Sequence, residues 1–536
     1  MSGIELRWAN KDRVLYQVPQ RGTDNKPIYY GDPGTPVWPD HRPLLRCATY
    51  GTPDGSEPNR LIQGDNLIAL QALIDEGWSS RIKCVYIDPP FNTGTAFAHY
   101  DDGFENTIWL GLMRDRLKLL HKLLDDEQGS LWLELDEKMI AHARLILDEI
   151  FGPHNFVNMV VWQKKYSPSN DARYLSDNAD FIAVYAKNKA TWHRNLLCRT
   201  EAMDERYKNP DNDPRGPWSS GGLDVKTPNQ RDVYPIRTPN GGEVWPPKGT
   251  SWRYSKERFA ELVADNRIWF PPKGKQVPRY KRFLSEVQPG FVPLTLWLRH
   301  EVGDSQEAKK EVKALLPDVE DVFTTPKPER LMRRIIEIAT AEGDWVLDSF
   351  AGSATTAAVA YQMGRRFITI ETGEHAQTHC LPRLEKVRMG AEPYERAIGG
   401  GFVFEEVGPP LVVHDPLLGI DRLNPVYKNG QYQRAVCLLT GFKHQPDDTI
   451  LHGRAGGTDS KRFCHIAERG VLVTKEYIEP ISQLLHSMEH ANGHDLATCV
   501  VYATKMTSDL GCFSNVEVVR IPAGFANIRS EKEGNK

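Results

Sequence analysis

The sequence predicts an α/β fold with a mostly parallel sheet that helices cover on both faces. Strand-like and helix-like segments alternate between residues 56 and 190, and the alternation resumes between residues 321 and 395. The strand-like segments are short, continuous apolar runs, a pattern typical of strands that are buried on both faces. Strands alternating with helices indicate crossover connections and therefore a parallel sheet.

The first stretch, residues 56–190, contains three expected helices and at least three expected strands. Apolar residues recur at helical spacing in three segments, namely Asn66–Glu76, Trp109–Leu124 and Glu137–Phe151. The expected strands are Ile82–Ile87, Ser130–Leu135 and Phe181–Tyr185, preceded by a strand end at Leu61–Asp65.

The second stretch, residues 321–395, repeats this alternation. A helix is expected at Arg330–Ala339, a strand at Trp345–Asp348, a helix at Thr355–Met363 and a strand at Phe367–Glu371. Gly364 ends the second of these helices. After residue 400 further strand-like runs are expected at Ala435–Leu439, Val471–Thr474, Thr498–Ala503 and Val516–Ile521.

These patterns divide the chain into five parts. The expected parts are a Pro-, Gly- and Asp-rich N-terminal arm (1–55), two halves of one α/β domain (56–190 and 321–395), an irregular region between them (191–320) and a C-terminal α+β domain (396–536). The sequence predicts no role for the C-terminal domain.

Composition excludes several classes of protein. The 536 residues are 40% hydrophobic and 26% charged, which is typical of a folded chain. No apolar run approaches the roughly 18 residues of a membrane span, and the first residues lack the pattern of a secretion signal. The eight cysteines form no CxxC pair, so we expect reduced thiols, no zinc site and a cytoplasmic location. The net charge of −4 does not exclude nucleic acid, because phosphates respond to local patches.

A basic, aromatic stretch lies in the irregular region. Residues 248–282 contain ten Lys or Arg against three Asp or Glu, interleaved with six aromatic residues, Trp252, Tyr254, Phe259, Trp269, Phe270 and Tyr280. Cations suit phosphates and rings suit bases, so the stretch is a candidate nucleic-acid surface. A solvated face over a small aromatic core is the equal alternative. The candidate DNA-binding residues are Lys273, Lys275, Lys281 and Arg282.

The first motif that carries chemistry reads Asp88-Pro89-Pro90-Phe91 and follows the strand Ile82–Ile87. Ligand sites in open α/β sheets occur at the carboxyl ends of strands. Prolines have a fixed φ and no N–H group, so they hold the chain rigid and leave carbonyl oxygens as acceptors. A planar amine could donate one hydrogen to Asp88 and the other to the Pro89 carbonyl while its ring stacks on Phe91. A plain strand-terminating turn is the alternative.

The second motif runs from Val346 to Thr356, through a strand, a turn of small residues and a helix start. This arrangement brings backbone N–H groups close to an anionic group. Glu371 ends the next strand, 23 residues after Asp348, where an acid is placed to bind ribose hydroxyls. Gly352 is a single glycine and weak evidence by itself, so a structural loop stays open as the alternative.

Together the two motifs resemble the β-group amino-methyltransferases of DNA, in which an Asp-Pro-Pro-aromatic motif precedes the cofactor motif. The resemblance spans roughly residues 60–390, and within it the sequence is most similar to modification subunits of type III restriction systems. The segments that carry it are Gly64–Leu67, Asp148–Gly152, Asn155-Phe156, Asp180–Lys187, Asn209–Gly216, Trp252–Ser255, Gly303–Lys310 and Thr325–Pro328.

The resemblance implies a Rossmann-like domain that transfers a methyl group from S-adenosylmethionine to the N6 amine of a flipped-out adenine in double-stranded DNA. It implies that residues 56–190 carry catalysis, with catalytic roles for Asp88, Pro89, Pro90 and Phe91, and that residues 321–395 bind the cofactor. It implies that Phe350, Gly352 and Ser353 line the methionine end of the cofactor. The other implied cofactor contacts are Thr325 and Lys327 near its carboxylate, Glu371 at the ribose, Asp65 at the adenosine end, and Asp348.

Two residues depart from the family pattern. Phe91 stands where the family usually has Tyr, which preserves stacking and loses a hydroxyl. Ala354 stands where the family usually has Gly, and its methyl group could tighten the cofactor pocket or exclude a positive φ.

The resemblance also implies partners and leaves alternatives open. It places target recognition in residues 191–320 and implies a modification subunit of a restriction or anti-phage system, with a homodimer and a separate restriction or helicase subunit as further expectations. Methylation of cytosine N4 or of RNA is one alternative. A subunit that binds S-adenosylmethionine and DNA with little activity of its own is another.

Overall fold

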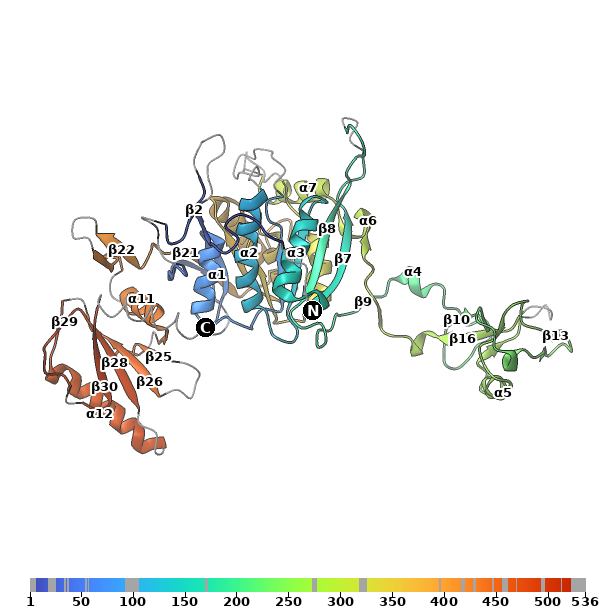
Figure 1. The fold of residues 1–536 in the computed structure, drawn as a ribbon. Helices are drawn as coiled ribbons and strands as arrows, with labels where there is room; N and C mark the ends of the chain where they lie inside the picture. Colours follow the sequence, from blue (N-terminus) through green and yellow to red (C-terminus); the bar gives the residue numbers. More distant parts are fainter. Residues whose placement is uncertain are drawn as a thin grey trace. The chain divides into compact units, whose positions relative to one another are not determined.

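The chain folds into two compact units, Met1–Arg194 with Leu294–Lys536 and Asn195–Pro293 (Figure 1). The structure is a computed structural model. It describes residues 6–17, 26–32, 35, 38–53, 55, 57–91, 106–168, 172–271, 277–317, 325–394, 397–415, 420–427, 430–445, 448–455, 461–468, 470–492, 497–511 and 513–521.

The first unit is built on a sheet that has ten strands within the described residues, in the order β18-β7-β8-β6-β5-β19-β20-β4-β21-β3. Neighbours run parallel, except that β8 is antiparallel to β6 and β7, and β3 is antiparallel to β21. The strands are β3 (Leu44–Gly51), β4 (Asn59–Gln63), β5 (Cys84–Ile87), β6 (Ser130–Leu135), β7 (Phe156–Gln163), β8 (Ala179–Ala186), β18 (Leu296–Trp297), β19 (Trp345–Asp348), β20 (Arg366–Glu371) and β21 (Gly401–Val407).

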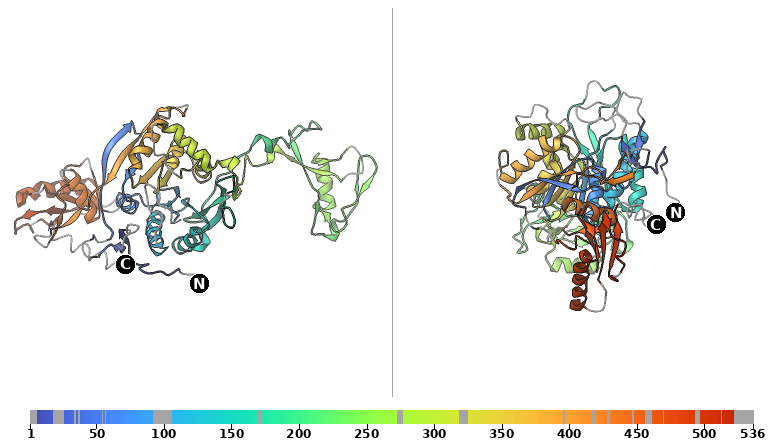
Figure 2. Two further views of the ribbon diagram at one scale, coloured as in Figure 1. Left: turned by 90° about the horizontal axis from the view of Figure 1, so that it is seen from above. Right: turned by 90° about the vertical axis from the view of Figure 1, so that its left-hand side faces the viewer.

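Helices cover both faces of this sheet (Figure 2). One face carries α1 (Asn66–Asp75), α2 (Asn106–Leu123) and α3 (Met139–Phe151), and the other carries α8 (Glu329–Ala339), α9 (Thr355–Gln362) and α10 (Leu381–Met389). Short helices α6 (Arg299–Val302), α7 (Ser305–Leu315) and a π-helical turn, Ala376–Cys380, connect them. The predicted α/β fold with a mostly parallel sheet is therefore confirmed.

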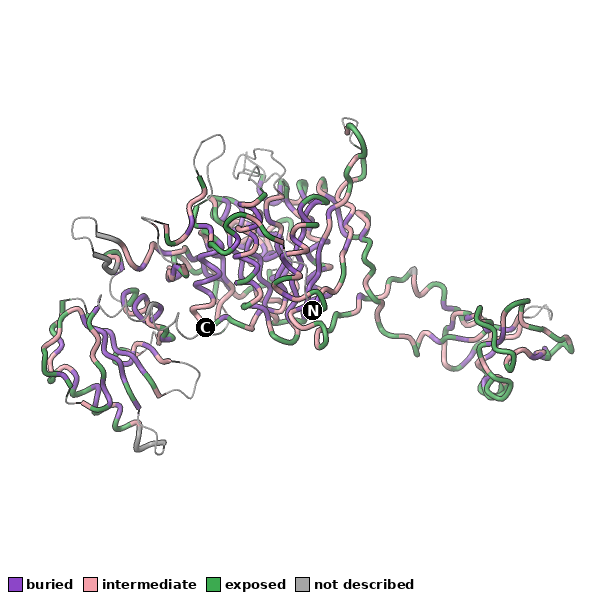
Figure 3. The backbone as a smooth tube through the Cα atoms, in the orientation of Figure 1, coloured by how far each residue is buried: buried purple, intermediate pink, exposed green. Residues whose placement is uncertain are grey.

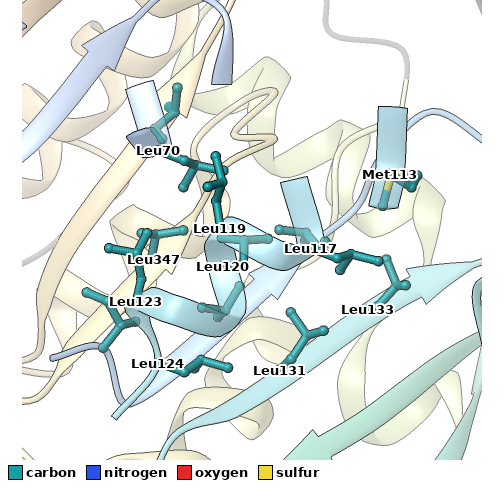
Figure 4. Packing of buried hydrophobic residues seen from close by; sticks show 14 of the residues in the cluster. Leu70, Met113, Leu117, Leu119, Leu120, Leu123, Leu124, Leu131, Leu133 and Leu347 are labelled. Carbon is teal, nitrogen blue, oxygen red and sulfur yellow. The ribbon is translucent and has the colours of Figure 1, made fainter. Parts of the chain in front are cut away.

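The core of the first unit lies between the sheet and the helices α1–α3. Apolar side chains from α1, α2, β6 and β19 pack together there, and Figure 4 labels, among others, Leu70, Leu117, Leu120, Leu131 and Leu347. Each of these leucines is fully buried. Burying a leucine side chain contributes about 1.5–3 kcal/mol, so this cluster is a major source of the unit's stability.

Between β5 and β19 the chain changes the side of the sheet toward which it adds successive strands. From β5 the chain continues through α2 to β6 on one side, and from β19 it continues through α9 to β20 on the other. At such a switch point the loops after the two strands diverge and leave a crevice at the carboxyl ends. Both chemistry-bearing motifs of the sequence begin at this point.

The sheet is larger than the sequence predicts. The strand β3 belongs to the expected irregular arm, and β21 belongs to the expected C-terminal domain, yet both complete the edge of the main sheet. Most of β3 is exposed or half-buried, so its sequence lacks the apolar run of a central strand. The strand β7 was also not predicted.

The second unit, Asn195–Pro293, is smaller than the predicted irregular region. Its elements include a three-stranded sheet, β10 (Trp218–Gly221), β16 (Arg279–Phe283) and β15 (Ile268–Trp269), and the helix α5 (Lys256–Ala264). Two short strands, β9 (Leu197–Cys198) and β17 (Gly290–Phe291), pair where the chain enters and leaves it. A small core of buried side chains holds it together, namely Leu223, Tyr234, Ile236, Trp252, Leu262 and Ile268.

The C-terminal region folds as the expected mixture of helices and strands. A sheet joins β24 (Phe442–His444), β25 (Gly453–Ala455), β26 (Arg462–Ile466), β28 (Thr498–Ala503) and β30 (Val516–Arg520), and α12 (Lys475–Asn492) packs on it. The predicted strand Ala435–Leu439 is wrong, because these residues lie in α11 (Gly430–Thr440). A short apolar run does not distinguish a buried helix from a strand. No helix among the described residues is long and apolar enough to cross a bilayer.

Candidate active site

The carboxyl edge of the parallel strands collects most of the predicted site residues. Asp88 follows β5, Asp348 ends β19, Glu371 ends β20 and Asp65 follows β4. The strands β5 and β19 pair directly, with Leu347 opposite Val85. The two motifs, 258 residues apart in sequence from Asp88 to Val346, therefore emerge side by side.

The stub Asp88–Phe91 is held in place by the helix α2. Trp109 is fully buried and donates its indole N–H to the Pro90 carbonyl at 2.7 Å. Pro89 is buried, and Phe91 is half-buried against the core between the sheet and α1–α3. Because both ends of the proline pair are anchored, the carboxylate of Asp88 has a rigid base.

A lysine whose side chain is 10% exposed lies against Asp88. The ammonium of Lys327 is hydrogen-bonded to Asp88 Oδ2 and lies 3.5 Å from Glu134 Oε1 on β6. Glu134 is fully buried, and the hydroxyl of Tyr86 donates to its other oxygen at 2.7 Å. The same ammonium is 5.6 Å from the centroid of the Phe91 ring. One cation thus connects the Asp88–Phe91 motif to an acid in the interior of the sheet.

The electrostatics of this cluster favour a charged lysine. Burial disfavours the cation, but the carboxylates of Asp88 and Glu134 outweigh burial and raise the pKa of Lys327 above its ordinary value. Burial raises the pKa of Glu134 to about 8, although Lys327 opposes this effect. Burial also raises the pKa of Asp180 on β8, which forms an ion pair with Lys164 at 2.6 Å. Glu134 is therefore less acidic than an exposed glutamate.

In the structure Lys327 makes contacts that were not predicted, and Glu134 joins the candidate site. The sequence predicts that Lys327 and Thr325 contact the carboxylate of the cofactor, and that contact stays a prediction. In the structure Lys327 binds Asp88 and Glu134, while Thr325 is exposed. Sequence reasoning missed Glu134. Its one signal was an acid within the otherwise apolar strand Ser130–Leu135.

The turn after β19 is tied to the end of β20. The backbone N–H of Gly352 donates to Glu371 Oε2 at 2.8 Å, and the N–H of Gly373 donates to Glu371 Oε1 at 3.2 Å. The N–H of Phe350 donates to Asp348 Oδ1 at 2.9 Å. Burial raises the pKa of Asp348 to about 7, and the nearby carboxylates of Asp88 and Glu371 add to this effect. The Asp88–Phe91 motif and the turn after β19 are therefore close enough to interact electrostatically.

Ala354 adopts the conformation that its methyl group was expected to hinder. It is fully buried and has φ 57° and ψ 32°, in the left-handed region, directly before α9. Gly352 also has a positive φ, 54°. The turn therefore forms with Ala354 in place, at a cost of about 1–2 kcal/mol relative to glycine.

Ser353 is held by a residue that sequence reasoning missed. Ser353 is buried, and the guanidinium of the fully buried Arg383 donates to its carbonyl at 3.2 Å and to Thr355 Oγ1 at 2.9 Å. Arg383 is neutralised by Glu329 at 2.7 Å. Arg383 on α10 therefore fixes the start of α9 through Ser353 and Thr355.

Asp65 combines a structural contact with a position at the site edge. Its carboxylate caps α1 by accepting from the N–H of Leu67 at 2.7 Å. It also pairs with Arg116 on α2 at 3.2 Å, and its side chain is 53% exposed. Half of this carboxylate remains open to solvent, so its predicted role at the adenosine end stays a prediction.

The structure corrects one predicted DNA contact in the second unit. Lys281 is fully buried, and its ammonium bonds to the carboxylates of Asp211 and Asp213, the latter at 3.0 Å. It therefore stabilises this unit and offers no charge at the surface. Arg282 is exposed, as a phosphate contact requires. Lys273 and Lys275 lie outside the described residues.

Comparisons with known proteins agree with this geometry. A family model described as DNA methylase matches residues 82–380. The chain is 32% identical to the StyLTI Mod subunit of a type III restriction-modification enzyme from Salmonella typhimurium over 330 residues, which cover 56% of this chain and 49% of that protein. It is 29% identical to the probable HindVI Mod subunit from Haemophilus influenzae over 415 residues, or 67% and 55% of the two chains.

A third relative is matched over most of its length. The chain is 46% identical to the DNA adenine methyltransferase YhdJ of Escherichia coli over 341 residues, which cover 64% of this chain and 87% of that protein. By contrast, the chain spans about half the length of the two Mod subunits.

Proposed function

Because the chain belongs to the DNA methylase family, we propose that it transfers a methyl group from S-adenosylmethionine to the exocyclic N6 amine of adenine in double-stranded DNA. The observation that carries this proposal is the direct pairing of β5 with β19. This pairing sets the Asp88–Phe91 motif beside the turn at Gly352, so a target amine and a methyl donor can meet in one crevice.

The residues around the turn fit the proposed cofactor. Glu371 is a half-buried carboxylate at a strand end, which suits ribose hydroxyls, and the turn of small residues lies next to it, since the N–H of Gly352 donates to Glu371. Asp348, Phe350, Gly352 and Ser353 belong to the same turn. S-Adenosylmethionine, when bound, supplies a methyl group on a sulfonium, and the reaction is then an in-line displacement.

The Asp88–Phe91 motif would prepare the amine for this displacement. The nitrogen of adenine N6 is a poor nucleophile because its lone pair is delocalised into the ring. Hydrogen bonds from its two hydrogens to Asp88 and the Pro89 carbonyl would localise the lone pair and orient the nitrogen. Once the nitrogen–carbon bond has formed and the sulfur–carbon bond has broken, the nitrogen releases one proton, for which Asp88 is the nearest acceptor.

The target base would have to leave the duplex to reach this crevice. Flipping costs a few kcal/mol, and stacking of the base on Phe91 would return about 1–3 kcal/mol. Lys327 would hold the Asp88 carboxylate in position during this step, because the two are hydrogen-bonded and Glu134 fixes the lysine from the other side.

The relatives support a wider role as the modification subunit of a restriction system. Two of them are named Mod subunits of type III enzymes, and the third is named a DNA adenine methyltransferase. We therefore infer a DNA substrate with adenine as the target, a separate restriction subunit as a partner and target recognition by the unit Asn195–Pro293. Arg282 would contact phosphates there.

The experiment compares Asp88→Ala with wild type. Genomic DNA from cells that express each protein is analysed for N6-methyladenine by mass spectrometry and for its sequence context by modification-sensitive sequencing. Asp88→Ala should abolish methylation, while calorimetry should still detect binding of S-adenosylmethionine. The control is Glu137→Gln, which changes an exposed acid just after β6. Substantial methylation by Asp88→Ala would contradict the mechanism, and N4-methylcytosine in place of N6-methyladenine would contradict the target.

A further inference from the structure

Glu134 is an acid in the interior of the main sheet. All six residues of β6 are buried, and Figure 3 colours most of the middle of this unit as buried. Leu131, Leu133 and Leu135 pack into the core between the sheet and α1–α3, so the side chain of Glu134 points to the opposite face. A buried carboxylate is destabilising unless it is well paired. Stability alone therefore does not explain an acid at this position.

Acids and bases gather across four neighbouring strands at the edge that carries Asp88. Asp88 follows β5, Glu134 lies near the end of β6, and Asp180 lies near the start of the antiparallel strand β8. Lys164, which follows β7, pairs with Asp180 at 2.6 Å. Lys327 is hydrogen-bonded to Asp88. Three acids therefore share two bases, and Glu134 is the acid of this cluster without a base of its own.

Glu134 competes with Asp88 for the ammonium of Lys327. The ammonium lies 3.5 Å from Glu134 Oε1, while Glu134 Oε2 accepts from the Tyr86 hydroxyl at 2.7 Å, which holds the first oxygen toward the lysine. Both acids raise the pKa of Lys327. An ammonium that a second carboxylate also attracts withdraws less charge from the first. A charged Glu134 therefore leaves Asp88 a stronger hydrogen-bond acceptor.

We propose that Glu134 is a positioning residue for methyl transfer, which acts on the target amine through Lys327 and Asp88. In its charged form it shares the ammonium with Asp88, and the Asp88 carboxylate then accepts the hydrogens of the amine more strongly. A stronger acceptor localises the lone pair of the nitrogen further and makes the nitrogen a better nucleophile. This inference rests on the proposed function and adds to it a residue that acts only through others.

The test separates charge from shape at position 134. Glu134→Gln keeps the size of the side chain and its bond to Tyr86 but removes the charge. Burial raises the pKa of Glu134 to about 8, so the acid is mostly charged in an assay at pH 9. Single-turnover methylation is measured with tritium-labelled S-adenosylmethionine and a duplex that carries the sequence found methylated in genomic DNA. The rate constant should fall about 10- to 100-fold, and the Kd values for cofactor and duplex should change less than about twofold.

The stability of Glu134→Gln distinguishes this role from a structural one. At pH 9 the variant should unfold at a temperature no lower than wild type, because it removes a buried charge. Tyr86→Phe keeps that charge and removes the hydroxyl, so it should lower the rate less than Glu134→Gln does. Glu137→Gln, which changes an exposed acid just after β6, is the matched control and should equal wild type in rate and stability.

A double-mutant cycle with Lys327 tests the route by which Glu134 acts. Lys327→Met removes the group that connects the two acids, so in this background Glu134→Gln should no longer lower the rate. The double variant should also unfold at a higher temperature than Lys327→Met alone, because the single change leaves Glu134 buried without its cation.

Each other outcome overturns the inference in a distinguishable way. An unchanged rate in Glu134→Gln, with wild type active, would leave the proposed function intact and remove Glu134 from it. A raised Kd for S-adenosylmethionine at an unchanged rate would assign Lys327 to the carboxylate of the cofactor instead. An equal loss of rate with and without Lys327, or a larger loss in Tyr86→Phe, would show that Glu134 does not act through the lysine by its charge. Failure of wild type to methylate any duplex would overturn the proposed function, and the inference with it.

Discussion

Replacing Glu134 with Gln should make the stability of the first unit less dependent on pH. Glu134 is fully buried, and burial raises its pKa from 4.5 to about 8. A carboxyl group whose pKa is raised on folding is disfavoured in its charged form. Wild type therefore loses stability as the pH rises from 4.5 toward 8, and the loss is complete above the folded-state pKa. Gln carries no charge at any pH and can still accept the hydrogen bond from Tyr86.

The size of the effect follows from the pKa. A pKa raised from 4.5 to about 8 corresponds to at most about 5 kcal/mol in the free energy of unfolding between the two pH limits. Calorimetric unfolding at pH 5 and pH 8 measures the free energy of unfolding of both proteins. The value for Glu134→Gln minus the value for wild type should rise by about 3–5 kcal/mol between these two pH values.

The control for this measurement is Glu137→Gln, which changes an exposed acid three residues away and should track wild type at both pH values. A constant difference between Glu134→Gln and wild type would show that Glu134 does not titrate in the folded protein. A gain of wild type on the variant with rising pH would show that the ion pair with Lys327 outweighs burial.

Three further changes test the remaining assignments. Ala354→Gly should leave unfolding within about 1 kcal/mol of wild type and calorimetric cofactor affinity unchanged, because relief of the left-handed strain is offset by a lost buried methyl group and a more flexible unfolded chain. If Ala354→Gly bound S-adenosylmethionine and wild type did not, the wild-type turn would be defective. Glu371→Ala should raise the calorimetric Kd for S-adenosylmethionine about 10- to 100-fold with little effect on DNA affinity, since hydrogen bonds to a charged group are lost; an unchanged Kd would move the ribose site elsewhere. Lys281→Met should lower the unfolding temperature by removing the cation that Asp211 shares with the buried Asp213, whereas Arg282→Ala should reduce the slope of log DNA affinity against log salt by about one unit. If Lys281→Met instead reduced the salt slope and Arg282→Ala instead lowered the unfolding temperature, Lys281 would belong to the DNA surface.

The sequence predicts the centre of the sheet well because burial on both faces leaves a clear apolar signal. The bounds of β6 and β19 match the expected Ser130–Leu135 and Trp345–Asp348, and the two motifs lie at one edge as expected. The edge strand β3 escapes prediction, because a half-exposed strand carries little periodic signal and its partner β21 is distant in sequence.

The candidate site was predictable in its strand-end residues and unpredictable in its supporting contacts. Asp88 and Glu371 stand at the ends of apolar runs, where position alone indicates a ligand site. Trp109 and Arg383 support the site from the interior, and only the assembled fold shows their contacts, whereas Glu134 had one sequence signal, an acid within an apolar strand. Lys281 shows the converse limit, since a basic run does not indicate which of its cations face solvent.

The pairing of β3 with β21 has a consequence for synthesis on the ribosome. β3 hydrogen-bonds to the sheet through β21, and Gly401 follows Gly51 by 350 residues. At about 5–20 residues per second, β3 waits roughly 20–70 s for the strand that will pair with it. During that time its backbone is an open strand edge, of the kind that pairs with other chains. Expression at a reduced temperature or with chaperones should therefore raise the yield of folded protein more than changes to the core would.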